Sequence, residues 1–169
     1  MGTGVPTTAT YIILVAVAAP ALTQLQIEPI VSHFFVFYYG VLADITPPVA
    51  LAAYAAAGIA GSNPFTTGNT AFRLGIAKAL VPFVFVYSPS LLLVAQGFNF
   101  YDFFVTLISA MIGIGLIGIG FTGYLFKRVS TFQRWYLATI SLLFIAPGLS
   151  SSIIGLVLVL PILILQLRK

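Results

Sequence analysis

The stretch ADITPPVALAAY, residues 43–54, decides the fold because it interrupts one of the most apolar regions of the chain. It carries an acidic residue, Asp44, and two adjacent prolines, Pro47 and Pro48. Proline lacks a backbone N–H and pushes the preceding residue out of helical conformation, so a helix cannot continue through this stretch. The freed carbonyls are costly in lipid unless they face protein or a water-filled cavity. The stretch therefore predicts a broken membrane helix with a polar break.

The composition places this break in an integral membrane protein. Of the 169 residues, 60% are hydrophobic and only 6% are charged, whereas soluble domains carry roughly 25% charged residues. The mean hydropathy is +1.13. The chain has no cysteine, which excludes a disulfide framework and a thiolate metal site. The net charge of +4 comes from Lys and Arg near segment ends, which is typical of a topology signal and not of a nucleic-acid surface.

The apolar segments predict an all-α, polytopic fold. Because a spanning helix needs about 20 apolar residues, residues 8–22 predict a short re-entrant arm that starts at a Gly/Pro/Thr tip. Residues 30–60 are too long for one span and predict two half-helices, 30–43 and 49–60. Turn residues predict a loop over 61–70.

The rest of the chain predicts two more spans and a helical hairpin. These are expected at residues 71–94, 103–126 and 135–167, and the hairpin is expected to turn at 146–152. Basic residues mark the cytoplasmic ends of the spans. They are Arg73, Lys78, Lys127, Arg128, Arg134, Arg168 and Lys169.

Other candidate motifs favour structural roles. The literal GxGxxG in GIGLIGIG, residues 113–120, lies inside a span and lacks the acidic partner of a dinucleotide site, so it predicts a small-residue helix-packing face. His33, the only histidine, is expected to cap or pack, Glu28 to be solvated, and Asp102 to favour a helix N-terminus. The acids, the histidine and the lack of cysteine offer no nucleophile–base pair or metal cluster, so we predict no enzyme.

The break, residues 44–48, is the strongest candidate for chemistry. Carbonyls, the Thr46 hydroxyl and the Asp44 carboxylate suit a hard cation such as sodium, and transporters use discontinuous helices in this way. The alternative is a plain proline kink in which Asp44 bonds to a neighbouring helix. The N-terminal tip, residues 2–8, also combines glycines, a proline and hydroxyls, and we expect it to meet the break near the midplane.

These two stretches resemble a known family. GTGVPTTATYIILVAVAAPAL, HFFVFYYGVLADITPPVALAAYAAAGIAG and TAFRLGIAKALVPFVFVYSPSLLL closely resemble the C-terminal part of the large, DctM-like permease subunit of TRAP (tripartite ATP-independent periplasmic) transporters. The resemblance is closest to the fused, TAXI-type branch and covers residues 2–95. It implies a domain over 1–95 from the second permease repeat, and an extension over 96–169 with one span and a helical hairpin.

The resemblance also implies a function. Such elevator-type, inverted-repeat transporters import organic acids such as C4-dicarboxylates with sodium across the inner membrane of bacteria or archaea, and a periplasmic solute-binding protein delivers the substrate. The cation and substrate site implied for this chain comprises Gly4, Val5, Pro6, Thr7, Thr8, Gly40, Asp44, Ile45, Thr46, Pro47 and Pro48. Sodium is expected near Gly40, Thr46 and the tip, with the backbone and Thr46 more important than the Asp44 carboxylate. No other cofactor is expected.

The length sets a further expectation. A large permease subunit has two repeats, so we expect this polypeptide to be a fragment or to pair with a chain that supplies the remaining repeat and the small membrane subunit. Alone it is then expected not to transport, and substrate uptake by liposomes that contain only this chain would contradict that. A structural or assembly subunit, whose breaks are packing devices, is the alternative function.

Overall fold

The computed structural model describes residues 6–94, 97–146 and 148–167. Within these ranges the secondary structure is helical and contains no strand. Four helices are long and apolar enough to cross a membrane: Thr7–Gln24, Pro64–Tyr87, Phe100–Thr122 and Leu149–Leu167. The prediction of an all-α polytopic membrane protein is therefore confirmed. The chain divides into two compact units, Met1–Val86 and Tyr87–Lys169. The predicted division at residue 95 stays a prediction.

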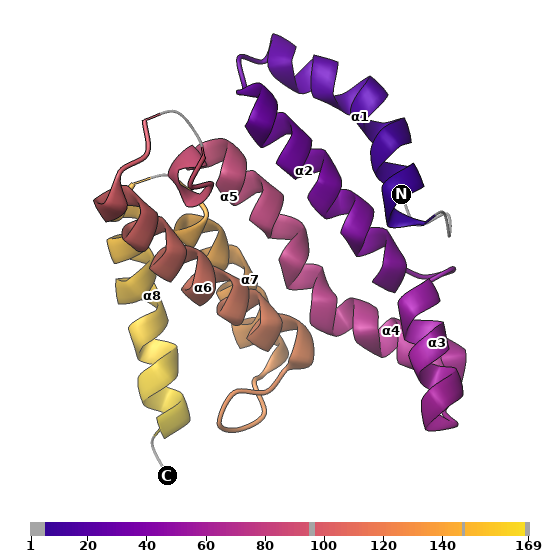
Figure 1. Ribbon diagram of the computed structural model, residues 1–169. Coiled ribbons are helices and arrows are strands. Elements are labelled where there is room, and N and C mark those ends of the chain that lie inside the picture. Colours follow the sequence, from indigo (N-terminus) through magenta and orange to yellow (C-terminus); the bar gives the residue numbers. More distant parts are fainter. Residues whose placement is uncertain (1–5, 95–96, 147, 168–169) are drawn as a thin grey trace. The chain divides into compact units, whose positions relative to one another are not determined.

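The N-terminal unit begins with two neighbouring helices, α1 (Thr7–Gln24) and α2 (Pro29–Leu42), which pack along each other (Figure 1). Helix α1 is longer than the predicted arm at both ends. Its 18 residues correspond to about 27 Å, so length and composition place it among the candidate spans. The expectation that this segment is too short to cross is thus wrong on length alone.

The predicted break is present after α2. A 3-10 turn, η1 (Ala43–Ile45), is followed by extended backbone at Thr46 and by a left-handed Ala50, and only then does α3 (Leu51–Ala60) begin. The Pro47–Pro48 peptide bond is cis. The two half-helices are therefore confirmed, with ends within two residues of the predicted ones.

The predicted loop over residues 61–70 is wrong from Pro64 onward. Helix α4 (Pro64–Gly75) starts there, since the Asn63 side chain accepts a hydrogen bond from the Thr66 N–H at 3.1 Å and proline suits the first helical position. The glycine in this segment, Gly68, is buried, and a Cβ there would lie 2.7 Å from the Tyr54 ring. It lets α4 approach α3 closely, so a residue that suggests a turn serves helix packing.

Helix α4 continues through η2 (Ile76–Leu80) into α5 (Val81–Tyr87), and a short turn, η3 (Pro89–Leu91), follows. The span predicted over 71–94 therefore starts and ends about seven residues too late. Pro82 lies within the first turn of α5, where its missing N–H is tolerated, whereas Pro89 lies beyond the helix.

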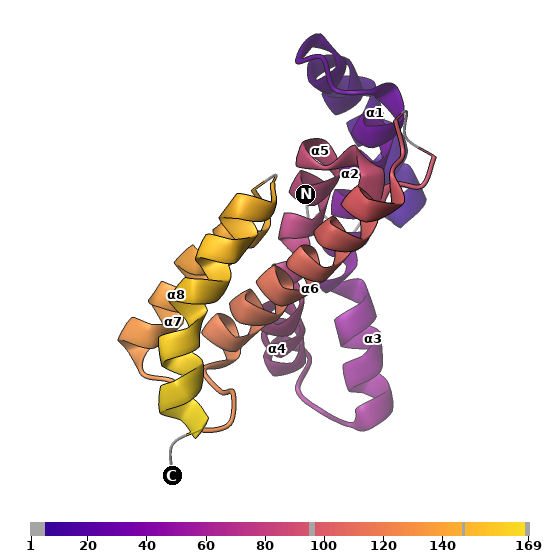
Figure 2. The ribbon, with the colours of Figure 1, turned by 90° about the vertical axis from the view of Figure 1, so that its left-hand side faces the viewer.

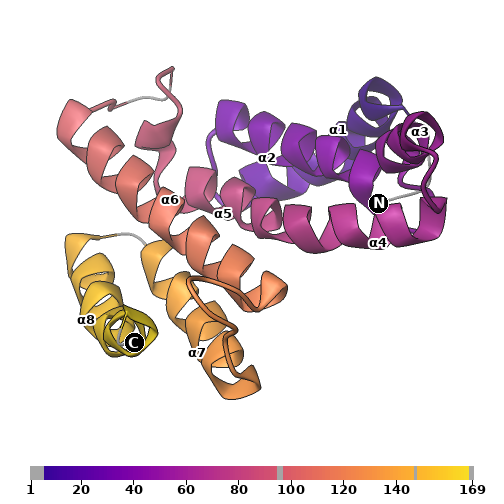
Figure 3. The ribbon, with the colours of Figure 1, turned by 90° about the horizontal axis from the view of Figure 1, so that it is seen from below.

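The C-terminal unit contains α6 (Phe100–Thr122), α7 (Thr131–Ser141), η4 (Leu142–Phe144) and α8 (Leu149–Leu167). Figures 2 and 3 show α7 and α8 as the arms of a hairpin, with α6 beside α7. The core gathers apolar side chains from all three helices, including Leu116, Leu137 and Val159. The predicted span and hairpin are confirmed, although α6 begins and ends three to four residues earlier than expected. Pro147, at the predicted turn, lies outside the described residues.

The glycines of GIGLIGIG lie on two faces of α6. A Cβ at Gly113 would lie 3.0 Å from the Phe144 Cβ, and one at Gly120 would lie 3.1 Å from the Arg134 carbonyl oxygen. Gly115 and Gly118 meet no atom within 4 Å. The predicted helix-packing role is confirmed for Gly113 and Gly120, which allow α7 and η4 to pack against α6.

Candidate ion-binding site at the helix break

The break leaves backbone oxygens without helical donors. The carbonyl of Asp44 would be paired in a helix by the N–H of residue 47 or 48, and both are prolines. Some oxygens of the break find other donors: the Thr46 hydroxyl donates to the Leu42 carbonyl at 2.7 Å, and the Tyr54 hydroxyl donates to the Pro48 carbonyl at 2.6 Å. No described residue donates to the carbonyls of Ile45, Pro47 or Val49. Hydrogen-bond acceptors therefore gather at the break in excess of donors.

The tip and the break meet through Asp44. The Thr7 hydroxyl, in the first turn of α1, donates to Asp44 Oδ2 at 2.7 Å. One helical turn earlier, a Cβ at Gly40 would lie 3.5 Å from the Thr7 carbonyl oxygen, so Gly40 lets the start of α1 approach α2. The predicted meeting of tip and break is thus present in the described part of the tip.

The Asp44 carboxylate lies in an apolar segment and has few polar groups around it. It is half-buried, and the Thr7 hydroxyl is its hydrogen-bond partner. Within the described ranges no second donor and no basic side chain pairs with it. Because ionisable side chains within membrane segments are costly and normally pair with a partner, Asp44 is a candidate to hold a cation.

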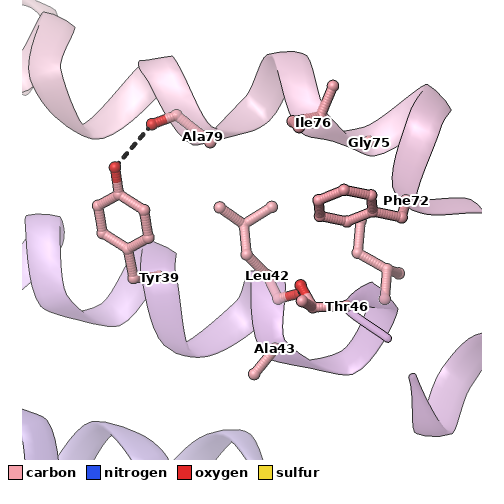
Figure 4. A pocket seen from close by; sticks show the side chains of 9 residues that line it. Tyr39, Leu42, Ala43, Thr46, Phe72, Gly75, Ile76 and Ala79 are labelled. Carbon is pink, nitrogen blue, oxygen red and sulfur yellow. Dashed lines mark hydrogen bonds between the residues drawn. The ribbon is translucent and has the colours of Figure 1, made fainter. Parts of the chain in front are cut away.

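Thr46 lies on a different side of the broken helix. It lines a cavity of about 210 Å³ between α2–η1 and α4–η2, together with Ala43, Ile45 and Phe72 (Figure 4). The Tyr39 hydroxyl points to one end of this cavity and donates to the Ala79 carbonyl at 2.9 Å. The cavity is mainly apolar, so the Thr46 hydroxyl, already bonded to Leu42, is its main polar feature beside Tyr39.

The predicted site residues therefore separate into groups. Thr7, Gly40 and Asp44 come together between α1 and α2, while Ile45 and Thr46 face the cavity toward α4. The others are spread around these positions: Pro6 precedes α1, Thr8 lines an open groove with Tyr11 and His33, and Pro47 and Pro48 form the break itself. Gly4 and Val5 lie outside the described residues.

Sequence reasoning missed two tyrosines whose hydroxyls donate hydrogen bonds to backbone carbonyls at the break and near it. Tyr54 lies six residues after the carbonyl it serves, at Pro48, and Tyr39 bonds a carbonyl forty residues away. A tyrosine one turn into the helix after a Pro-Pro pair could have suggested the first contact. The second depends on tertiary packing and has no local signal.

His33 has a local partner in the groove between α1 and α2. Its Nδ1 lies 2.7 Å from the Tyr11 hydroxyl, and the two rings are 6.2 Å apart. The described residues contain no group of three or more His, Cys, Asp or Glu side chains that could hold a metal ion. The Tyr11 contact joins His33 on α2 to α1, which agrees with the predicted packing role.

The fold and the site indicate the class of protein. It is a multi-pass helical membrane protein with a carboxylate and unpaired carbonyls at an interrupted helix, an arrangement that secondary transporters use in their ion and substrate sites. Residues 1–100 match the family described as tripartite ATP-independent periplasmic transporter, DctM component. The match spans more than half of the chain, which therefore belongs to this family of TRAP transporter permeases. Comparison with curated proteins and with solved structures produces no match.

Family membership confirms the resemblance to a TRAP large permease subunit and makes the chain a component of a membrane transporter. The family is a transporter family and not an enzyme family. The match includes both the tip and the break and ends at the start of α6, so most of the C-terminal unit lies beyond it. Assignment to the fused branch stays a prediction.

Proposed function

We propose that this chain is the part of a TRAP permease that supplies one half of a sodium-coupled site for the import of organic acids. In this proposal a periplasmic solute-binding protein delivers the substrate, and the remaining permease repeat and small membrane subunit complete the transporter in the inner membrane of a bacterium or archaeon. Family membership supports the transport role.

The observation that carries the proposal is the environment of Asp44. Its carboxylate receives a hydrogen bond from Thr7, at the tip, and has no other pairing with a described residue. The break adds backbone oxygens that no described donor reaches. Oxygen ligands of this kind suit a hard cation, and sodium would offset the negative charge that the membrane otherwise disfavours.

The proposal assigns different tasks to the residues. Asp44 and the carbonyls of the break bind the cation, Thr7 orients the carboxylate, and Gly40 leaves room for the tip to approach. Thr46 holds the end of α2 through its bond to Leu42 and so fixes the backbone of the break, from the side that faces the cavity toward α4. The tip residues Gly4 to Thr8 close the site and contribute to substrate binding.

Sodium-dependent thermal stabilisation of the purified chain tests the proposal. A ligand that binds only the folded state raises its stability, so sodium is expected to raise the Tm above the value in potassium at equal ionic strength. Asp44→Asn and Thr46→Ala are expected to abolish this difference. Asp102→Asn is the matched control, because it removes a carboxylate from the exposed first turn of α6, and it is expected to retain the sodium effect.

A structural or assembly subunit is the alternative function, and one observation favours it. The Thr7–Asp44 hydrogen bond satisfies one carboxylate oxygen without any ion, as a plain kink tied to a neighbouring helix would do. This alternative predicts the same Tm in sodium and in potassium for the wild type. It also predicts that Asp44→Asn lowers the Tm equally in both salts.

A further inference from the structure

One end of the C-terminal unit concentrates basic residues. The loop between α6 and α7 carries Lys127 and Arg128, and Arg134 follows in the first turns of α7. In the sequence, two further basic residues come directly after α8. The nearest acidic residue of this unit, Asp102, lies in the first turn of the 23-residue helix α6, and thus about 30 Å from the loop. Within the described part of this unit, no aspartate or glutamate lies in the α6–α7 loop or in α7.

The loop that presents these charges is folded. The Val129 N–H donates to the Gly123 carbonyl at 2.9 Å, and the Leu125 N–H donates to the Lys127 carbonyl at 3.2 Å. The Lys127 N–H donates to Gln166 Oε1 at 3.1 Å and so ties the loop to the end of α8. The basic side chains therefore start from a fixed backbone.

A groove of about 260 Å³ lies beside this loop, at the corner between α6 and α7. Its lining consists of Gly120, Phe121, Thr131, Arg134, Trp135 and Ala138. The walls are mainly apolar, and Trp135 is 73% exposed. The groove thus combines an apolar channel with polar groups, in a segment at the end of a membrane span.

Arg134 places a fixed positive charge in the groove. Its Nε donates to the Gly120 carbonyl at 2.6 Å and its Nη2 donates to the Phe121 carbonyl at 2.9 Å, which holds the guanidinium against the C-terminus of α6. Within the described ranges, Nη1 and the Thr131 hydroxyl have no hydrogen-bond partner. Two residues that line the apolar groove therefore carry donors without a described partner.

A ligand that fits needs both an anionic group and an apolar tail. Aromatic side chains gather at membrane–water interfaces, and basic pockets at the cytoplasmic ends of spans bind anionic lipid headgroups. Tyr124, Phe126, Phe132 and Trp135 are all more than half exposed around the groove and its loop. A free inorganic anion would not use these apolar walls.

We propose that the α6–α7 corner binds an anionic phospholipid of the cytoplasmic leaflet. The phosphate contacts Arg134 Nη1 and the Thr131 hydroxyl, Arg128 and Lys127 supply additional positive charge, and an acyl chain lies along Phe121, Trp135 and Ala138. The site lies in the C-terminal unit, beyond residue 100 where the family match ends, and it does not depend on the proposed sodium site.

The test compares lipids on the purified full chain in detergent. Phosphatidylglycerol or phosphatidylcholine is added, and bound lipid is counted by native mass spectrometry while the Tm is measured. Phosphatidylglycerol is expected to remain bound and to raise the Tm more than phosphatidylcholine. The double variant Lys127→Gln/Arg128→Gln is expected to bind phosphatidylglycerol about 25-fold more weakly, at about five-fold for each charge.

The matched control removes the same charge elsewhere. Arg73→Gln/Lys78→Gln changes two exposed basic residues of the N-terminal unit and is expected to retain phosphatidylglycerol binding. Trp135→Ala is expected to weaken both lipids, because it removes an apolar wall. If the loop double variant does not fold, Thr131→Val, which removes one exposed hydroxyl, is expected to reduce the preference for phosphatidylglycerol.

Several outcomes would overturn the proposal. One is equal binding of the two lipids by the wild type, and another is equal loss in the loop variant and in the control pair. Full binding by both Lys127→Gln/Arg128→Gln and Thr131→Val would also exclude it. Inorganic phosphate is a separate arm, and stabilisation by phosphate equal to that by phosphatidylglycerol would identify a simple anion site instead.

Discussion

The broken helix of the N-terminal unit and helix α6 of the C-terminal unit differ in the continuity of their backbone hydrogen bonds. Helix α6 runs for 23 residues and carries its acid, Asp102, in the first turn, where a carboxylate suits the helix dipole. The α2–η1–α3 segment stops midway and carries Asp44 at the interruption. Gly113 and Gly120 in α6 serve packing, whereas prolines in the break free carbonyl oxygens. The two segments thus differ in whether their backbone oxygens are paired within a helix or are left without helical donors.

The largest expected effect comes from breaking α6 in the same way. Gly115 faces open space, so Gly115→Pro adds no clash beyond its own helix. It removes one helical hydrogen bond, crowds the preceding turn and is expected to cost about 3 kcal/mol or more. Unfolding by denaturant in micelles measures the loss. Gly115→Ala is the control, and it is expected to be neutral or to stabilise by up to about 1 kcal/mol. A small effect of the proline would mean that α6 tolerates a break as readily as the N-terminal unit does.

The break can be predicted from the sequence because it follows from the covalent structure of proline. Pro47 and Pro48 cannot donate hydrogen bonds in any fold, so the interruption could be placed to within two residues. The start of α4 was misplaced for the opposite reason. Gly68 suggested a turn, but packing against Tyr54 overrides that tendency, and the Asn63–Pro64 start signal decides the helix.

Contacts between distant segments are harder to predict. The Thr7–Asp44 bond joins residues 37 positions apart, and it gives the carboxylate a more central place than sequence reasoning did. Nothing in the spacing of residues 7 and 44 specifies this pairing, although the glycines, proline and hydroxyls of the tip predict that tip and break meet. The separation of Thr46 from the tip likewise depends on which face of α2–η1 packs against α4.

A second prediction concerns the two glycine faces of α6. Gly113→Val is expected to destabilise the C-terminal unit by about 2 kcal/mol, because its Cβ would meet the Phe144 Cβ at 3.0 Å and the Ser141 carbonyl at 3.2 Å. Gly115→Val, on the open face, is the matched control and is expected to change stability by less than about 0.5 kcal/mol. The same micelle unfolding assay measures both. Equal losses at the two positions would show that helix propensity, and not packing, limits α6.

A third prediction measures how strongly the tip is tied to the break. A double-mutant cycle with Thr7→Val and Asp44→Ala is expected to give a coupling free energy of about 1.5 kcal/mol, since a hydrogen bond to a carboxylate is stronger than one between neutral groups. The cycle is measured in potassium, so that sodium does not contribute. A coupling near zero would contradict the contact between the two segments.

The smallest expected effect is the coupling free energy across a hydrogen bond between two helices of the C-terminal unit. The Ser109 and Ser152 hydroxyls form a buried hydrogen bond of 2.9 Å between α6 and α8. Both partners are neutral, and in membrane proteins such interhelical bonds contribute only about 0.6 kcal/mol on average. A cycle with Ser109→Ala and Ser152→Ala is therefore expected to give less than half of the Thr7–Asp44 coupling. Similar couplings in the two cycles would mean that Asp44 behaves as an ordinary neutral packing residue, and the case for a cation at the break would lose its electrostatic basis.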